Sequence, residues 1–455
     1  MCHGPLFSKI ILFSIPLIVT NMLQLIFHAI DLVVLGQFAN AKSLAAVGAT
    51  SGLTVLVLNI FFGISVGVNV LTARYTGARD REKVSQTVHT AASVAFFGGI
   101  LMALLGVLIS RPVLRLMAAP EEILDRSTLY MQIYCAGIPF VIFYNFGSSI
   151  LRALGDTRRP LIFMIIAGVV KVLLNLFFVV VLHLDVAGVA LATMISNALS
   201  ALMVIITLRT ARDANRLIWK KIRIRGEILK EMLKIGLPAG IQGSFFSLSN
   251  VVIQSTVNSF GAVVIAGNTA AYSLESIVYV GSSAYYYTGI SFIGQNHGAQ
   301  KYKRIARSIL YCFLCSFTAS VLFGWGFYLL GVPLLKIYNP DPEVIKWGLI
   351  RMKILLTTYF LCGFMDVISG ALRGLGHSVK PTIVTLMGVC FFRIGWVFWV
   401  FPKQPTMENL MVSYPVSWAL VSIVNGAILF VVCRKMFRTA VKEHVHPNYA
   451  LLRGR

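Results

Sequence analysis

The chain contains one ten-residue stretch twice, as Leu151–Pro160 and again as Leu372–Pro381. Five of the ten positions are identical, and the copies lie 221 residues apart, close to half of the 455-residue chain. Shorter matches share this offset or one of 222 residues: Gly77-Ala78 with Gly298-Ala299, Tyr130–Ile133 with Arg351–Ile354, and Ile15–Leu17 with Leu237–Ala239. This period is far too long for a solenoid, whose units span roughly 20–50 residues. Each repeat unit is therefore half of the protein.

Both halves consist mainly of long apolar runs. The chain is 57% hydrophobic and 13% charged, with a mean hydropathy of +0.80, which excludes an ordinary soluble globule. Backbone groups in lipid must be bonded internally, so runs of about 20 apolar residues cross the membrane as helices. The first run is too long for a cleavable signal peptide. We predict an all-α integral membrane protein with twelve transmembrane helices in two pseudo-symmetric six-helix bundles, at residues 10–35, 44–72, 88–110, 127–151, 160–182, 188–208, 233–258, 263–292, 308–331, 349–372, 381–401 and 411–433.

A polar segment at residues 209–234 separates the two halves. It holds nine Lys or Arg residues and three acids, which is typical of a partly helical cytoplasmic linker. The predicted organisation is an N-terminal lobe at 1–220, a C-terminal lobe at 221–440 and a cytoplasmic tail at 441–455.

The net charge of +23 first suggests nucleic-acid binding, but the placement of the bases argues against it. Of the 40 Lys and Arg residues, 29 fall on the side that both termini share, 7 on the opposite side and 4 in or at the edge of the spans. This is the positive-inside pattern of a multi-pass protein of the plasma (inner) membrane with both termini cytoplasmic. Part of the excess also favours anionic lipid head groups.

The first span carries a polar stripe of Asn21, Gln24, His28 and Asp31. Steps of three, four and three residues place these side chains on one helix face. A carboxylate inside a membrane is costly and normally faces a bundle interior or a wet cavity. The stripe therefore predicts a lumen-lining face. The alternative is that Asp31 merely lies at the outer membrane interface, since the span ends nearby.

Two further acids, Glu275 and Asp366, lie well inside predicted spans. A buried carboxyl can exchange protons or hold Na⁺ together with carbonyl and amide oxygens, so Asp31, Glu275 and Asp366 are candidate ion-coupling residues. The repeat offset takes Asp366 onto Asn145, Glu275 near Thr54 and Asp31 near Ile253. The two halves thus share the same arrangement of spans but carry different ionisable groups at equivalent positions. The functional site is expected at the positions where they differ.

The remaining candidate site residues are polar or aromatic side chains within the spans. They are predicted to line a substrate cavity: Asn21, Gln24, His28, Asn145, Asn175, Gln242, Phe246 and Tyr279. Aromatic rings can attract cationic solutes, although aromatic residues in a span usually serve packing alone. Lys171 lies one turn before Asn175, and its long side chain can instead reach an interface.

Enzymatic chemistry has little support in the chain. The eight histidines and seven cysteines form no cluster with metal-ligand spacing, and the cysteines imply no disulfide framework. No phosphate-binding loop marks a nucleotide site. We therefore predict no enzyme, no cofactor and no resident metal, apart from possible Na⁺ near Glu275 or Asp366. Two pseudo-equivalent bundles suit alternating access better than a channel.

Several of these motifs together resemble the multidrug and toxic compound extrusion (MATE) family of bacterial secondary transporters. The resemblance covers roughly residues 8 to 435 and rests on Ile15–Asp31, Leu44–Gly48, Gly294–Ala299 and both Leu-Arg-x-Leu-Gly copies. It implies two six-helix lobes across a central cleft, with drug leaving in exchange for H⁺ or Na⁺.

The family's functional positions map unevenly onto this chain. Its first-helix aspartate falls on Asp31, and Asn175 matches the Asn of an archaeal-type Asn–Asp pair whose Asp is replaced here by Val179. The acid of a sodium-coupled pattern in the seventh helix is replaced by Phe246, and its tenth-helix acid is approximated by Asp366. The resemblance thus leaves both H⁺ and Na⁺ open.

These observations predict an ion-coupled antiporter that exports amphipathic, often cationic organic compounds. Its expected partners are small organic cations or drugs and membrane lipid, with no nucleic acid, and the protein is expected to be a monomer. One alternative is a flippase for lipid-linked oligosaccharides, which needs a larger cationic cavity for a pyrophosphate and for which only Lys171 and Arg393 are candidates. The other is a membrane-embedded enzyme.

Overall fold

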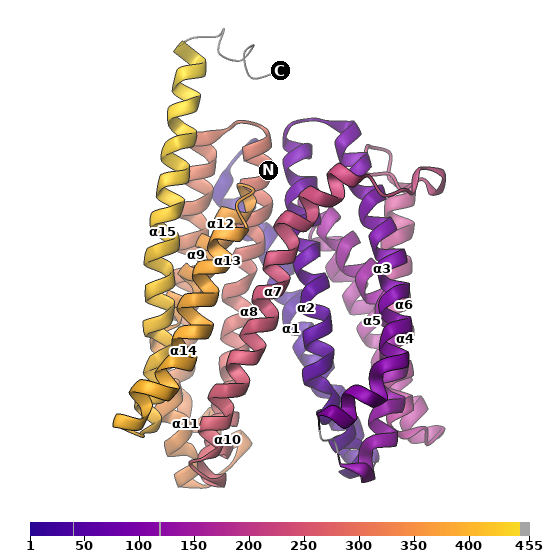
Figure 1. Ribbon diagram of the computed structural model, residues 1–455, viewed down its shortest axis with the longest axis vertical. Helices are drawn as coiled ribbons and strands as arrows, with labels where there is room; N and C mark the ends of the chain where they lie inside the picture. Colours follow the sequence, from indigo (N-terminus) through magenta and orange to yellow (C-terminus); the bar gives the residue numbers. More distant parts are fainter. Residues whose placement is uncertain (40, 118–119, 446–455) are drawn as a thin grey trace. The chain divides into compact units, whose positions relative to one another are not determined.

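The computed structural model describes residues 1–39, 41–117 and 120–445, and these residues are almost entirely helical (Figure 1). The first half contains α1 (Leu6–Phe38), α2 (Ala41–Gly77), α3 (Arg81–Leu116), α4 (Glu121–Leu154), α5 (Arg158–Leu176) and α6 (Asp185–Thr210). The second half contains α7 (Gly226–Asn258), α8 (Ala262–Gly298), α9 (Tyr302–Leu329), α10 (Gly331–Tyr338), α11 (Pro342–Leu355), α12 (Tyr359–Gly374), α13 (Val379–Thr385), α14 (Phe392–Gly395) and α15 (Met407–Val445). A 3₁₀ turn joins α11 to α12, and π-helical turns continue α5, α13 and α14.

In the part of the chain that the structure describes, the long helices form twelve segments, because α11 with α12 and α13 with α14 each form one segment. Within the described residues, eleven segments are long and apolar enough to cross a membrane by length and composition. The remaining one, α7, coincides with the span predicted at 233–258, but its Gln, Ser and Asn side chains lower its hydropathy. The prediction of an all-α membrane protein with twelve transmembrane helices is confirmed.

The two halves repeat the same helix packing. In the first half, α4 packs against α2, α3 and α6. In the second half, α11 and α12 take the place of α4, and together they pack against α8, α9 and α15, which correspond to α2, α3 and α6. The sequence repeat is therefore a repeat of architecture.

Contacts divide the chain into two compact units, one of Leu12–Ser247 and one of Met1–Ile11 with Leu248–Arg455. The division falls inside α1 and inside α7, so each of these continuous helices contributes to both units. The lobe boundary near residue 220 concerns the sequence repeat and stays a prediction. Of the tail expected from residue 441, α15 takes in residues up to Val445, and the rest lies outside the described residues.

The repeated ten-residue stretch ends a helix in the same way in both copies. Gly155 and Gly376 adopt φ angles of 103° and 87°, which favour glycine. The N–H of Gly155 donates to Arg152 O at 2.9 Å, and that of Gly376 donates to Arg373 O at 2.8 Å, each with a second bond one residue later. Both copies thus end a helix with the same glycine turn.

The turns at Gly77 and Gly298 do not use the glycine as their left-handed residue. Helices α2 and α8 do end at these glycines, but the left-handed residues are Arg79 (φ 60°) and Gln300 (φ 55°), two positions later. The turn thus places its strained residue at equivalent non-glycine positions in the two halves.

Helices α2 and α7 approach closely at a seam of small residues. A Cβ atom on Gly63 would clash with the backbone of Gly240, and one on Gly240 would lie 2.7 Å from Ile60 Cα. Since the neighbouring atoms are backbone, no side-chain rotation relieves the overlap. Small residues spaced four apart, Gly63 with Gly67 and Gly236 with Gly240, thus permit this contact.

The substitution Gly63→Leu is expected to reduce the free energy of unfolding by at least about 1–3 kcal/mol, because it forces α2 away from α7. Thermal unfolding of detergent-purified protein measures the effect. Gly52→Leu is the matched control on the same helix, since a Cβ there meets nothing within 4 Å. Equal melting temperatures for the two variants would contradict the close packing of α2 against α7 at Gly63.

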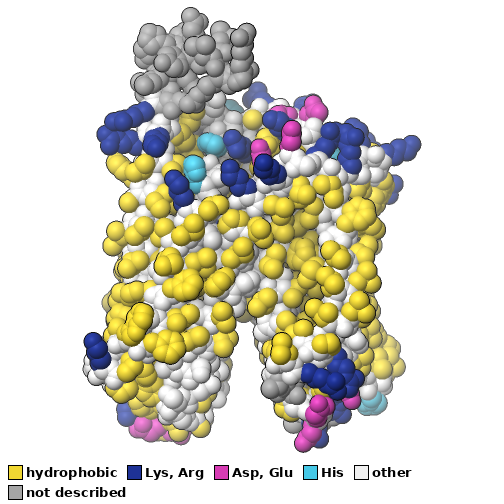
Figure 2. Space-filling view, viewed as in Figure 1, with side chains coloured by type: hydrophobic (Ala, Val, Ile, Leu, Met, Phe, Trp, Pro, Cys, Tyr) yellow, Lys and Arg dark blue, Asp and Glu magenta, His cyan; other side chains and the backbone are white. Residues whose placement is uncertain are grey.

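The exterior at mid-height of each unit is dominated by hydrophobic side chains, with most charged side chains at the ends (Figure 2). Large apolar residues are strongly exposed, among them Leu108 at 74%, Leu322 at 67% and Trp399 at 77%. Such a surface is stable only against lipid, as the apolar runs predict.

Candidate functional site

A buried carboxylate cluster joins α1 to α5 in the Leu12–Ser247 unit. Lys171 Nζ lies 2.6 Å from Asp31 Oδ2, and Asn175 Nδ2 donates to Asp31 Oδ1 at 2.7 Å. Asp31 is 6% exposed and Asn175 is fully buried. Lys171 and Asn175 are four residues apart on α5, so both point to the same side of that helix. Each carboxylate oxygen thus has one donor.

Apolar side chains surround this cluster. Val34, Tyr130 and Val179 belong to one buried hydrophobic group, against which Ile30 and Tyr134 pack. Charged groups interact more strongly in such surroundings than in water. Asp31 therefore faces the interior of the unit, and Lys171, for which reaching an interface was the expectation, is instead its counter-ion.

The rest of the predicted stripe does not join Asp31. Gln24 and His28 are exposed at the surface of their unit, and Asn21 is half-buried. The helix turns only its last polar residue toward α5.

The other predicted cavity residues are dispersed. Asn145 donates to Val141 O of its own helix at 2.8 Å. Gln242 is buried and Phe246 half-buried. Tyr279 is 44% exposed and belongs to the other unit. Their role in lining a substrate cavity stays a prediction.

The second unit holds a different ion pair. Arg351 on α11 donates from Nη2 and Nε to Glu275 Oε2 on α8, at 2.6 and 3.0 Å, and from Nη1 to Asn268 Oδ1 at 2.8 Å. Glu275 and Arg351 are 7% and 4% exposed. The guanidinium also lies 5.3 Å from the ring centre of Tyr272. All three guanidinium nitrogens of Arg351 thus have polar partners within this unit.

Sequence reasoning missed both Arg351 and Asn268 as partners of Glu275. One signal was available, because a carboxylate inside a span requires a cation. Arg351 is one of four bases within the spans, and the offset of 221 takes it onto Tyr130, which packs beside the Asp31 cluster.

Arg393 on α14, a candidate base of the flippase alternative, is a further buried cation. It is 3% exposed, its Nε donates to Ser417 Oγ at 2.9 Å, and its guanidinium lies 3.9 Å from the ring centre of Tyr414. Its counterpart at an offset of 222 is Lys171, but the counterpart of Asp31 is the buried Ile253. Arg393 is thus held by aromatic faces where Lys171 is held by an acid.

Asp366 on α12 is half-buried. Unlike Asp31 and Glu275, it has no basic group within 4 Å in the part of the chain that the structure describes. It is therefore the predicted acid that forms no ion pair, although the guanidinium of Arg373 on the same helix attracts it from farther away. Among the described residues, no three His, Cys, Asp or Glu side chains converge as metal ligands.

Comparison with known proteins agrees with the fold and the repeat. The family model described as MatE matches residues 16–177 and again 238–399, two segments offset by 222 residues. The "Probable multidrug resistance protein YoeA" of Bacillus subtilis is 24% identical over 441 residues, covering 95% of each chain. "Probable multidrug resistance protein YpnP" of the same organism is 26% identical over 391 residues, covering 86% of this chain and 87% of that one.

Solved structures show the same fold. A crystal structure of MATE in the straight conformation superposes with a TM-score of 0.89 at 20% identity, covering 96% of this chain and 98% of that one. MATE in the bent conformation gives 0.88 at 21% identity, with the same coverage. With two family matches that span both halves, the chain belongs to the MatE family and is a membrane transporter of the multidrug efflux type rather than an enzyme.

Proposed function

We propose that this transporter is an antiporter that exports amphipathic, often cationic organic compounds in exchange for H⁺ or Na⁺. The observation that carries the proposal is the Asp31–Lys171–Asn175 cluster, a buried carboxylate with one exchangeable cation. The relatives named for multidrug resistance and multidrug export support the substrate class.

The cluster supports a coupling mechanism in which an entering H⁺ or Na⁺ competes with Lys171 for the carboxylate of Asp31. An entering H⁺ or Na⁺ that neutralises Asp31 removes the attraction that holds Lys171, and so weakens the contact between α1 and α5. Because α1 contributes to both compact units, a change at Asp31 acts on a helix that both units share. This is the kind of two-state element that alternating access needs.

The three acids are assigned different roles. Asp31 and Asp366 are proposed as coupling residues, since Asp31 holds a lysine that a cation could displace and Asp366 forms no ion pair within 4 Å in the described chain. Glu275 is proposed to be structural, because two guanidinium nitrogens of Arg351 occupy one of its oxygens. A Na⁺ ion would accordingly bind near Asp366 rather than Glu275.

The membrane orientation follows from the distribution of bases. We infer an inner-membrane protein with both termini cytoplasmic, because 29 of 40 Lys and Arg residues lie on the side of the termini.

The flippase alternative is less well supported by the same geometry. Its candidate phosphate ligands were Lys171 and Arg393. Lys171 is neutralised by Asp31, and Arg393 is 3% exposed against Tyr414. Neither offers an open cationic surface to a pyrophosphate.

Transport into proteoliposomes tests the proposed function. We expect uptake of a fluorescent organic cation to be driven by an imposed pH gradient or by an imposed Na⁺ gradient, and not to occur without either. The two gradients are imposed separately, with an ionophore that dissipates each one as the control. Uptake that persists unchanged when both gradients are dissipated would contradict antiport.

A further inference from the structure

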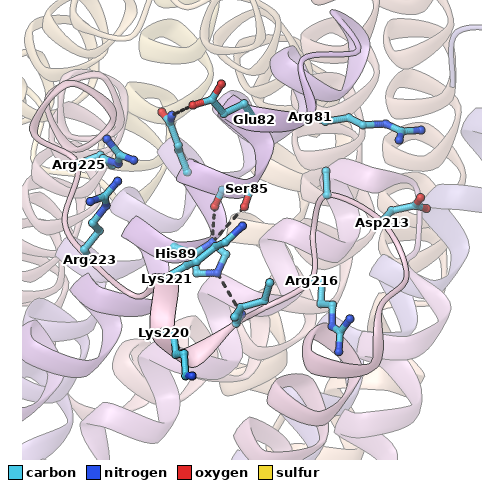
Figure 3. Close-up of a pocket in the computed structure, with 13 residues that line it drawn as sticks. Arg81, Glu82, Ser85, His89, Asp213, Arg216, Lys220, Lys221, Arg223 and Arg225 are labelled. Carbon is cyan, nitrogen blue, oxygen red and sulfur yellow. Dashed lines mark hydrogen bonds between the residues drawn. The ribbon is translucent and has the colours of Figure 1, made fainter.

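A basic cavity lies between the start of α3 and the linker that joins α6 to α7 (Figure 3). Its volume is about 640 Å³, within the ~300–1,000 Å³ typical of ligand pockets. Two acids, Glu82 and Asp213, line it together with six bases: Arg81, Arg216, Lys220, Lys221, Arg223 and Arg225. All of these residues belong to the Leu12–Ser247 unit.

The positive charge of this cavity is not neutralised by the protein. None of the six bases pairs with a carboxylate anywhere in the described ranges of the chain. Glu82 accepts a bond from Gln86 Nε2 at 2.9 Å instead. An adjoining cavity of about 680 Å³ is lined by three bases and three acids, so the excess of bases does not extend into it. Like charges held together repel one another, and a bound anion removes that cost.

The linker backbone is fixed against α3 by His89. The Nε2 atom of His89 accepts the N–H of Ile218 at 3.0 Å, while Nδ1 donates to Ser85 O at 2.7 Å (Figure 3). His89 is 3% exposed. The N–H of Arg225 donates to Thr90 Oγ1 at 3.3 Å. The bases therefore project from a backbone that is ordered before a ligand binds, which favours binding.

The surroundings of the bases indicate which anion binds. Along residues 219–225, four bases are interspersed with three apolar residues. Trp219 and Ile224 are neighbours in sequence of the bases that line the cavity, do not line it themselves, and are 51% and 48% exposed. Tryptophan prefers the membrane–water interface, and bases beside a membrane attract anionic lipids. A soluble phosphate would engage the bases but leave Trp219 and Ile224 in water.

We propose that this cavity binds the phosphate head group of an anionic membrane phospholipid. The six bases neutralise the phosphate, and Trp219 and Ile224 contact the apolar part of the lipid. The site lies on the segment that connects the two repeated halves. The proposal goes beyond the transport function and does not depend on it.

Native mass spectrometry of the full-length protein in detergent tests the site, with dioleoyl phosphatidylglycerol as the probe. The triple variant Lys220→Gln, Lys221→Gln, Arg223→Gln is expected to bind its tightest phosphatidylglycerol at least about tenfold more weakly. The matched control removes three exposed bases outside the cavity, Lys303, Arg307 and Arg434, and is expected to keep that affinity. Phosphatidylcholine with the same acyl chains has no net charge, and it is expected to bind tightly to neither the cavity variant nor the control variant.

Two further arms separate lipid from soluble phosphate. Trp219→Ala is expected to weaken phosphatidylglycerol binding while leaving the affinity for glycerol 3-phosphate unchanged. Complete displacement by glycerol 3-phosphate at concentrations equal to those of the lipid would overturn the assignment to a lipid. Wild-type affinity in the cavity variant, or an equal loss in the control, would overturn the site itself.

Discussion

Replacing Arg351 by methionine is expected to lower the free energy of unfolding by roughly 3–5 kcal/mol, because it leaves a buried charge without its partner. The substitution leaves Glu275 buried at 7% exposure without the guanidinium that holds it at 2.6 and 3.0 Å. Asn268 Oδ1 loses its donor as well. The effect is measured as a fall in the thermal unfolding temperature of purified protein.

Two further variants show whether the unpaired charge is the cause. Adding Glu275→Gln to Arg351→Met removes that charge, and we expect the double variant to recover most of the lost stability. Lys346→Met removes an exposed ion pair with Glu343 on the same helix, and should cost less than about 1 kcal/mol. A double variant less stable than Arg351→Met alone would show that the pair is not the source of the effect.

The fold was predictable from the sequence because membrane spans obey a strong local constraint. Each run of apolar residues determines one helix, and the repeat places twelve of them in two equivalent sets. The Leu-Arg-x-Leu-Gly turns are also a local feature of the sequence, because glycine favours a positive φ. Gly155 and Gly376 both adopt one. Helix ends were less accurate: α2 runs to Gly77, although the apolar span was predicted to end at residue 72, because a helix continues past the lipid where no apolar run marks it.

The partners of the buried acids were only partly predictable. Asp31 and Asn175 were each predicted as site residues but not as partners, and Lys171 was expected to reach an interface, because its length allows either arrangement. The pairing of Glu275 with Arg351 depends on how α8 and α11 rotate against each other, which the apolar pattern of neither helix determines. The linker cavity was not foreseen either, because His89 and Ile218 are 129 residues apart.

Replacing Asp31 by asparagine is expected to reduce drug export to the level of protein-free vesicles. Asparagine has nearly the same shape and can still accept a bond from Asn175, but it neither attracts Lys171 nor exchanges a cation. Uptake of a fluorescent organic cation into everted vesicles provides the measurement, with membrane content checked by immunoblot. Asp125→Asn is the matched control, since Asp125 is 81% exposed and pairs with Arg111 at the surface, and it should retain export.

Stability and transport can then be separated at the same pair. Lys171→Met leaves the Asp31 carboxylate buried with Asn175 as its remaining donor, so this variant should unfold at a lower temperature. The double variant Asp31→Asn, Lys171→Met carries no charge there and should regain that stability. If Asp31 serves coupling rather than packing, the regained stability does not restore export. A stable double variant that exports drug at the wild-type rate would contradict the coupling role and assign the pair to structure alone, and coupling would then have to depend on Asp366.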